Sequence, residues 1–153
     1  MKIRFILLPL VLALATVTGL RAEVAKPVEK ADKPETELEQ VMSKMSKAWR
    51  QVRKASRDGK LTPATADFVV TVRTNAEAAA KLTPALEAEK PAAERAKFQA
   101  DYVAQMKKLI ERLTTLETAL KANDTATATK LVATVGDMMK SGHHDFKKPD
   151  EHR

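Results

Sequence analysis

The stretch that decides the fold is 98–120, FQADYVAQMKKLIERLTTLETAL. Its recurring apolar positions are spaced by four, four, three, four, three and four residues. They are Phe98, Tyr102, Met106, Leu109, Leu113, Leu116 and Leu120. Because an α-helix turns once in about 3.6 residues, this spacing places all these side chains on one face over about six turns. The stretch therefore predicts a long amphipathic helix, which Pro91 begins.

The segment after residue 35 predicts a first helix. Thr36 and Glu39 have the spacing of a capping box, in which each side chain accepts a hydrogen bond from a free backbone N–H. Apolar residues then recur every three or four positions until Asp58-Gly59 ends the helix. These residues are Leu38, Met42, Met45, Trp49 and Val52.

Two further helices complete the pattern. Thr62, followed by Pro63 at the first helical position, begins a helix that Thr83-Pro84 closes. Its apolar face is expected to comprise Phe68, Val69, Val72, Ala76 and Ala79. Asn123-Asp124 makes a turn and caps the last helix, which stops before Pro149. Its apolar residues are Leu131, Val132, Val135, Met138, Met139, His143 and Phe146.

Long amphipathic helices joined by short connections, with almost no strand pattern, predict an all-α fold. We expect an antiparallel up-down-up-down four-helix bundle over residues 36–148. The charged segment 23–35, with two prolines, predicts a flexible tether, and residues 149–153 a disordered tail.

The N-terminus, residues 1–22, has the pattern of a secretory signal peptide. Lys2 and Arg4 precede an apolar run, and Ala22 stands at the expected cleavage point. The run of about 16 residues is shorter than the roughly 20 that span a bilayer. We therefore expect export to the periplasm and no stable membrane insertion after cleavage.

Several function classes are disfavoured by composition. The chain contains no cysteine, which excludes disulfides, thiolate metal sites and covalent haem attachment through Cys-x-x-Cys-His. The formal charge of +7 falls to about +4 without the signal peptide, and no basic stripe carries the interleaved aromatics typical of nucleic-acid binding. Glycine-rich phosphate loops, Gly-x-Ser-x-Gly, His-Glu-x-x-His and paired Glu-x-x-His motifs are all absent. We expect a protein that is not an enzyme.

The three histidines all lie near the C-terminus. Successive helical residues are about 100° apart, so His143 and His144 cannot share a face. Four, seven and eleven positions before His143 the chain has Met139, Gly136 and Val132. The same steps before His144 give Lys140, Asp137 and Ala133. We expect His143 to face the core, His144 to face solvent, and His152 to lie in the tail.

One end of the predicted bundle gathers residues suited to a cofactor. The first and last helices are antiparallel neighbours, so Met42 and His143 each lie about 9 Å from that end. Phe98 and Tyr102 reach it from the long helix. Small residues there leave room, namely Ala76, Ala79 and Ala80. A thioether opposite an imidazole can hold a haem iron, and this ligand pair favours electron transfer. Met45 is expected to be ordinary core.

At these positions the chain resembles the cytochrome b562 family over residues 36–148. The matching motifs are Leu38-Glu39-x-x-Met42, Lys81-x-Thr83-Pro84, Phe98-x-x-x-Tyr102 and His143-x-x-Phe146. The resemblance implies a periplasmic electron-transfer protein with one non-covalent haem b. Met42 and His143 would be the axial ligands, and Phe98 and Tyr102 would lie against the haem. We expect a monomer that meets a periplasmic redox partner of unknown identity.

Two other functions remain open. The first is a haem-free periplasmic binding or chaperone-like helical module, favoured by methionine-rich helices, positive charge and a tether. The second is a copper or nickel site built from His143, His144, His152 and Met138 or Met139. The separate faces of the two adjacent histidines argue against it.

Overall fold

The computed structural model describes residues 35–148, and within this range the chain forms helices and no strand. The elements are α1 (Glu37–Arg57), η1 (Pro63–Thr65), α2 (Ala66–Ala79), η2 (Ala85–Glu89), α3 (Ala92–Lys121) and α4 (Thr125–Phe146), where η denotes a 3-10 helix. The all-α four-helix bundle is confirmed. The predicted signal peptide, the C-terminal tail with His152, and the tether apart from Glu35 lie outside the described residues.

α1 begins and ends where its sequence predicts. Thr36 Oγ1 accepts a hydrogen bond from the Glu39 backbone N–H at 3.2 Å, and Glu39 Oε2 accepts one from the Thr36 N–H at 2.7 Å. This is the predicted capping box. At the other end Gly59 has a φ of 64°, in the left-handed region that favours glycine. Local side-chain chemistry therefore fixes both ends of this helix.

α2 is the shortest of the four helices, with 14 residues against 30 in α3. Its predicted first turn is the separate 3-10 turn η1, where the Thr62 N–H donates to Thr65 Oγ1 at 3.2 Å. The connection to α3 contains η2, which the sequence pattern does not predict. Phe68 was predicted to face the core, and that is wrong: it is 43% exposed. It lies at the edge of the apolar face, about 100° from its neighbour Val69.

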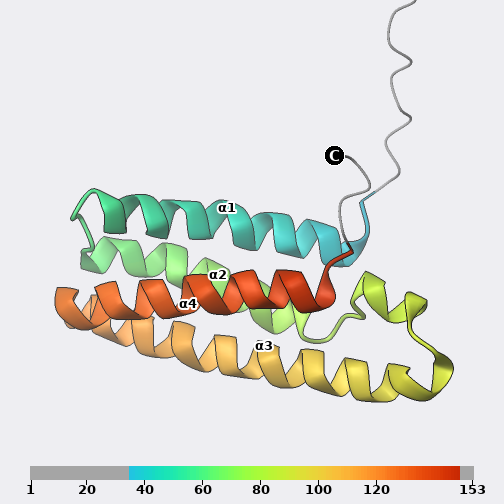
Figure 1. Cartoon of the computed structure of the whole chain (residues 1–153). Coiled ribbons are helices and arrows are strands. Elements are labelled where there is room, and N and C mark those ends of the chain that lie inside the picture. Colours follow the sequence, from blue (N-terminus) through green and yellow to red (C-terminus); the bar gives the residue numbers. More distant parts are fainter. Residues whose placement is uncertain (1–34, 149–153) are drawn as a thin grey trace, which may run out of the picture. The chain divides into compact units, whose positions relative to one another are not determined.

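The core runs along the bundle and draws on all four helices. Its fully buried side chains include Val52, Val69, Val72, Leu113, Leu116, Leu120 and Val135. Consecutive helices pack along their lengths and reverse direction from one to the next (Figure 1). By contrast, α1 and α4 touch at few points. We call this line the α1–α4 seam and the line between α2 and α3 the α2–α3 seam. In the described part of the chain no helix is long and apolar enough to cross a membrane.

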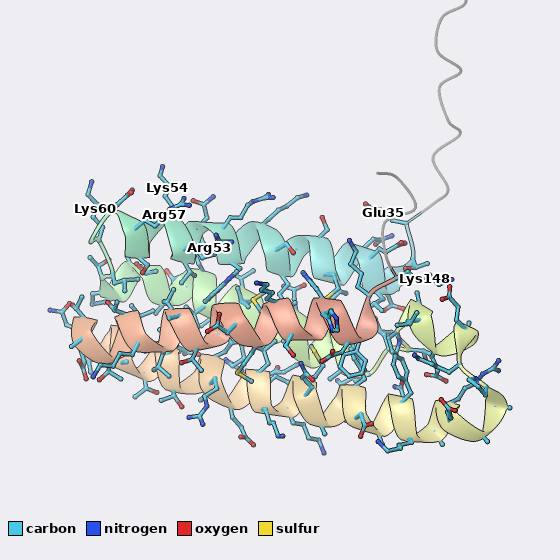
Figure 2. The ribbon with its side chains drawn as sticks, viewed as in Figure 1. Glu35, Arg53, Lys54, Arg57, Lys60 and Lys148 are labelled. Carbon is cyan, nitrogen blue, oxygen red and sulfur yellow. The ribbon has the colours of Figure 1, made fainter. Side chains whose placement is uncertain are left out.

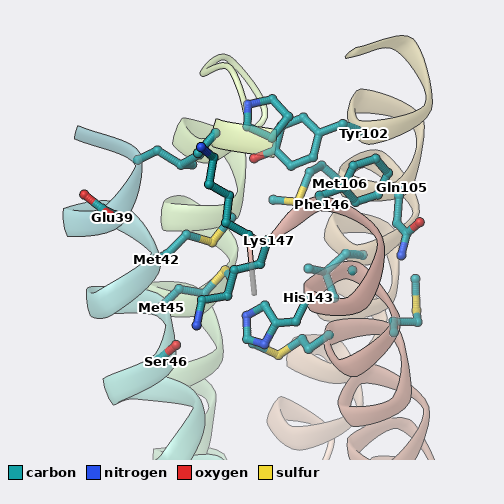
Figure 3. A pocket seen from close by; sticks show the side chains of 18 of the residues that line it. Glu39, Met42, Met45, Ser46, Tyr102, Gln105, Met106, His143, Phe146 and Lys147 are labelled. Atoms are coloured by element: carbon teal, nitrogen blue, oxygen red, sulfur yellow. The ribbon is translucent and has the colours of Figure 1, made fainter. Parts of the chain in front are cut away.

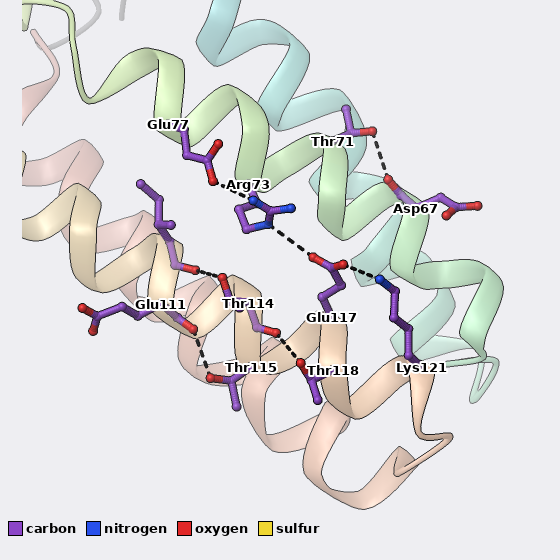
Figure 4. A network of polar contacts seen from close by, with 11 residues as sticks. Asp67, Thr71, Arg73, Glu77, Glu111, Thr114, Thr115, Glu117, Thr118 and Lys121 are labelled. Atoms are coloured by element: carbon purple, nitrogen blue, oxygen red, sulfur yellow. Dashed lines mark hydrogen bonds and ion pairs between the residues drawn. The ribbon is translucent and has the colours of Figure 1, made fainter.

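The α2–α3 seam is closed by charge as well as by packing (Figure 4). Arg73 on α2 donates from Nε to Glu117 Oε2 on α3 at 3.2 Å, and also pairs with Glu77 at 2.7 Å. Lys121 reaches the other oxygen of Glu117 at 2.5 Å. The hydrogen bonds from Lys121 and then Arg73 hold the pKa of Glu117 below its ordinary value. Both carboxylate oxygens of Glu117 are therefore engaged across or along this seam.

Candidate cofactor-binding site

A cavity of about 560 Å³ lies at the end of the bundle where α1 begins and α4 finishes. Residues of α1, α3 and α4 line it, together with Pro84 and Ala85 from the connection before α3 (Figure 3). Every methionine among residues 35–148 lines this cavity. They are Met42, Met45, Met106, Met138 and Met139. The site is therefore a largely apolar space with polarisable thioether walls, within the size range of ligand clefts, about 300–1,000 Å³.

The early end of α2 helps to make this space. α2 stops at Ala79, which lies against Tyr102 of α3. Because α3 begins at Ala92, its first turns extend past the end of α2. Tyr102 on α3 closes the floor at this point, because its hydroxyl donates to the Ala79 carbonyl at 2.9 Å. The ring is 3% exposed, and burial raises the pKa of Tyr102 to about 12. Tyr102 therefore stays neutral and fixed, presenting its ring to the cavity.

Met42 and His143 line the cavity from different helices. Met42 is half-buried on α1, and His143 projects from α4 toward α1 (Figure 3). His143 is exposed, so the expectation of a histidine directed into the packed core needs correction. The phase of the helix turns it toward α1, but the sparse contact between α1 and α4 leaves it open to solvent. Its imidazole forms no hydrogen bond or ion pair with residues 35–148.

His144 has a different environment. Its side chain is 87% exposed, and Nδ1 lies 2.8 Å from Asp145 Oδ1. The hydrogen bond from His144 lowers the pKa of Asp145. His144 does not line the cavity. The two adjacent histidines thus lie on different sides of α4, as their helical phase predicts, and only His143 borders the cavity.

The aromatic residues reach the site in two layers. Phe146 lines the cavity, and its ring packs edge-on against Tyr102 with centroids 5.3 Å apart. Phe98 does not line the cavity. Its ring packs at a tilt against that of Phe146, with centroids 5.1 Å apart, and Lys90 Nζ lies 5.1 Å from the centroid of the Phe98 ring. The sequence placed Phe146 on the apolar face of the last helix and in the family motif, but did not predict it as a residue of the site. Its position three residues after His143, on the same helical face, was the signal for a larger role.

The residues that line the cavity differ from those that the sequence predicts in three further ways. Ala76 and Ala79 are fully buried and do not line the cavity, so the space comes from helix spacing rather than from small side chains on α2. Met45 is buried, as expected of core, yet it also borders the cavity. Gln105, which sequence reasoning did not single out, lines it beside Gly142.

The donor set suits a haem better than a bare ion. Among residues 35–148, no three His, Cys, Asp or Glu side chains gather as a metal site. The cavity instead offers several thioethers, two aromatic rings and one imidazole that has no partner in the described part of the chain. Iron held in a porphyrin needs only axial donors from the protein, and apolar walls suit the macrocycle. The residues present therefore fit a haem.

In a comparison with known families, the model for cytochrome b562 matches residues 37–147. Comparisons with curated proteins and with solved structures gave no match. The matched range starts with α1, ends just after α4, and includes the whole cavity lining except Lys148. Because fold, cavity and family model coincide over the same residues, the chain belongs to the cytochrome b562 family.

Proposed function

We propose that this protein is a periplasmic electron carrier that binds one non-covalent haem b, with Met42 and His143 as axial ligands. One observation carries the proposal: a thioether on α1 and an imidazole on α4, which has no partner within residues 35–148, line the same methionine-rich cavity. The family is one of haem-binding electron carriers, and its known members are periplasmic. When bound, haem would supply an iron that cycles between its ferric and ferrous states.

The chain's own residues would divide the remaining work. The imidazole of His143 and the thioether of Met42 would each supply a lone pair to the iron, and a thioether ligand favours the reduced state and so raises the potential. Met106 and Met45, both buried, keep water from the inner wall. Tyr102 donates its only hydroxyl proton to the Ala79 carbonyl and so offers the site a ring face rather than an acid. Such a site transfers electrons without proton chemistry of its own.

The lack of cysteine gives the proposal a thermodynamic consequence. Only ligation and packing can retain the haem, so binding is reversible and linked to folding. The folded domain is stabilised in proportion to the logarithm of free haem above its dissociation constant. We expect the melting temperature to rise with haem concentration.

The proposal is tested by expressing residues 23–153, adding haem and recording visible spectra in both redox states. A sharp low-spin Soret shift and resolved α and β bands after reduction are expected. Met42→Ala and His143→Ala should each lose this spectrum, whereas His144→Ala is the matched control and should keep it. Circular dichroism of each variant shows whether the bundle still folds. Failure of the folded chain to take up micromolar haem would overturn the proposal, and loss in His144→Ala alone would overturn the ligand assignment.

Export is tested separately. Mass spectrometry of the protein recovered from the periplasm should show a chain beginning at Glu23, after cleavage behind Ala22. A chain that keeps residues 1–22 and stays with the membrane fraction would contradict the predicted signal peptide. We also expect the purified protein to elute as a monomer.

The methionine lining supports a second candidate, the haem-free binding module. Flexible methionine side chains adapt to irregular apolar partners, such as one face of an amphipathic helix. This candidate function predicts a folded protein that does not bind haem. Its methionine methyl resonances should then shift when an amphipathic apolar peptide is added, and the haem titration above separates the two functions.

A further inference from the structure

The positive charge of the bundle is concentrated on one segment. Residues 44–60, the later part of α1 and its end, carry seven basic side chains and one acidic one. The other described residues carry thirteen basic and fourteen acidic side chains. The net charge of the described chain therefore comes from this segment alone. Arg53, Lys54, Arg57 and Lys60 mark it in Figure 2.

A groove of about 630 Å³ runs along the α1–α4 seam at this segment. Arg50, Arg53 and Arg57 border it from α1, and their spacing of three and four residues puts them on one side of the helix over about 10 Å. Lys140 borders it from α4, where Asp137 is the acidic residue among the lining. We call these residues and the space between them the arginine groove. It is concave and strongly positive along its α1 side.

The arginines of the groove have no ion-pair partner among residues 35–148. Arg50, Arg53 and Arg57 form no ion pair with any residue of the described range. Three guanidinium groups at this spacing repel one another, and within residues 35–148 none of them is paired with a carboxylate, although Asp137 lies among the lining. Arginine presents a planar fork of donors that matches a carboxylate in two parallel hydrogen bonds. The groove is therefore chemically suited to carboxylates that come from outside the bundle.

The groove is continuous with the proposed haem cavity. Ser46, Met139 and His143 line both spaces. Space also remains at Gly136 on the α4 side, where an added Cβ would have no atom within 4 Å. An occupant of the groove would thus lie directly beside His143.

We propose that the arginine groove docks an acidic segment of the redox partner, a protein surface or loop rich in Asp and Glu. The inference rests on the proposed function, because an electron carrier needs its partner close to the cofactor. Complementary charge speeds encounter and orients the two proteins, and the effect weakens as salt rises. A concave site suits a protruding segment better than the flat surface of an anionic membrane.

The first experiment measures binding without any redox step. A short polyglutamate peptide is titrated into isotope-labelled protein, both haem-free and haem-loaded, while arginine side-chain resonances are recorded. The groove variant replaces Arg50, Arg53 and Arg57 by Gln. The matched control replaces Lys107, Lys108 and Arg112 by Gln, three exposed basic residues of α3 without ion pairs in the described range. Both lose three charges from one helix.

We expect the shifts to be confined to the groove. The groove variant should lose affinity about tenfold, because each of three exposed ion pairs contributes about twofold. The control should lose less than about threefold, the share expected from net charge alone. Equal losses in the two variants would overturn the proposal, since binding would then follow net charge. Tighter binding of anionic lipid vesicles than of the peptide to the same residues would also overturn it.

The second experiment measures electron transfer in the haem-loaded protein. Each hexacyanoferrate(II) gives one electron to a ferric haem and becomes hexacyanoferrate(III). We expect this rate to fall several-fold in the groove variant and with added salt, while the control changes less. The cationic reductant hexaammineruthenium(II) should respond in the opposite direction. Identical responses to both reagents would overturn the placement of the docking surface.

The two arms separate two kinds of failure. If the chain takes up no haem, no electron transfer can be measured in the second experiment. That result would contradict both the proposed function and a redox role for the groove. The peptide arm, which works on the haem-free protein, then still decides whether the groove binds acidic segments.

Discussion

The α2–α3 seam and the α1–α4 seam use the same residue type in opposite ways. At the α2–α3 seam Arg73 is held between Glu77 and Glu117, and the helices pack closely. At the α1–α4 seam Arg50 and Arg53 form no ion pair with a residue of the described range, and two cavities lie between the helices. A four-helix bundle can take its stability from its closely packed seams while one pair of helices stays loosely packed. The open seam is then available for a ligand and a partner.

The largest expected effect tests whether the open seam contributes little to stability. Leu116→Ala removes a fully buried side chain of α3 and should lower the free energy of unfolding by about 3 kcal/mol. Met139→Ala, on a half-buried residue of the α1–α4 seam, should lower it by about 1 kcal/mol or less in the haem-free protein. Urea unfolding with equal m-values measures both. Similar losses would mean that α1 and α4 pack together in solution.

A second effect concerns the floor of the cavity and depends on pH. The folded-state pKa of Tyr102 is raised to about 12. The contribution of its neutral hydroxyl to the free energy of unfolding is therefore complete below about pH 10, and it is lost as pH rises toward 12. Wild-type protein should lose about 2 kcal/mol more than Tyr102→Phe over this window. At pH 7 the variant should be about 1 kcal/mol less stable, for want of the hydrogen bond to Ala79. Parallel pH profiles for the two proteins would contradict the burial of this hydroxyl.

A third effect comes from removing one charge, that of Glu117, from the α2–α3 seam without changing the packing. Glu117→Gln keeps the shape of the side chain but weakens its bonds to Arg73 and Lys121, and should lower stability at pH 7 by about 1 kcal/mol. Since the folded-state pKa of Glu117 is lowered, the wild-type advantage is present above the ordinary pKa and disappears as pH falls through the lowered one. Thermal unfolding between neutral and acid pH measures this. An advantage that persists in acid would contradict the ion pairs.

The smallest effect is the matching change at the open seam. Arg53→Gln removes one of three mutually repelling charges and should change stability by no more than about 0.5 kcal/mol, in the stabilising direction. Added salt should reduce the difference from wild type, because screening relieves the same repulsion. A clear loss of stability would show that Arg53 has an internal partner, and the contrast between the seams would then fail.

The sequence predicted what depends on local chemistry. The caps at Thr36 and Asp124, the turn at Gly59 and the apolar stripe of α3 all lie where the pattern placed them. Each of these features is decided within a few residues, by side chains that bond to nearby backbone or by helical phase. The separation of His143 from His144 follows from phase as well.

What the pattern could not supply is the distance between helices. Phase showed which way His143 points, but its exposure depends on the sparse contact of α4 with α1. The same holds for the cavity, whose walls include Pro84 and Ala85 from a connection without periodicity. Phe98 matched the family motif, yet Phe146 stands between it and the cavity. Which of two aromatic residues is in front is a matter of tertiary packing.

The early end of α2 has a consequence for how such a site could change over generations. The cavity wall beyond Ala79 is made by a connection, residues 80–91, rather than by a fourth helix. Connections accept insertions and deletions far more readily than helix interiors do. Lengthening or shortening this segment would resize the chamber while leaving α1, α3 and α4, and hence Met42 and His143, in place. Variation could thus retune what the bundle accommodates by editing a stretch that carries neither proposed ligand.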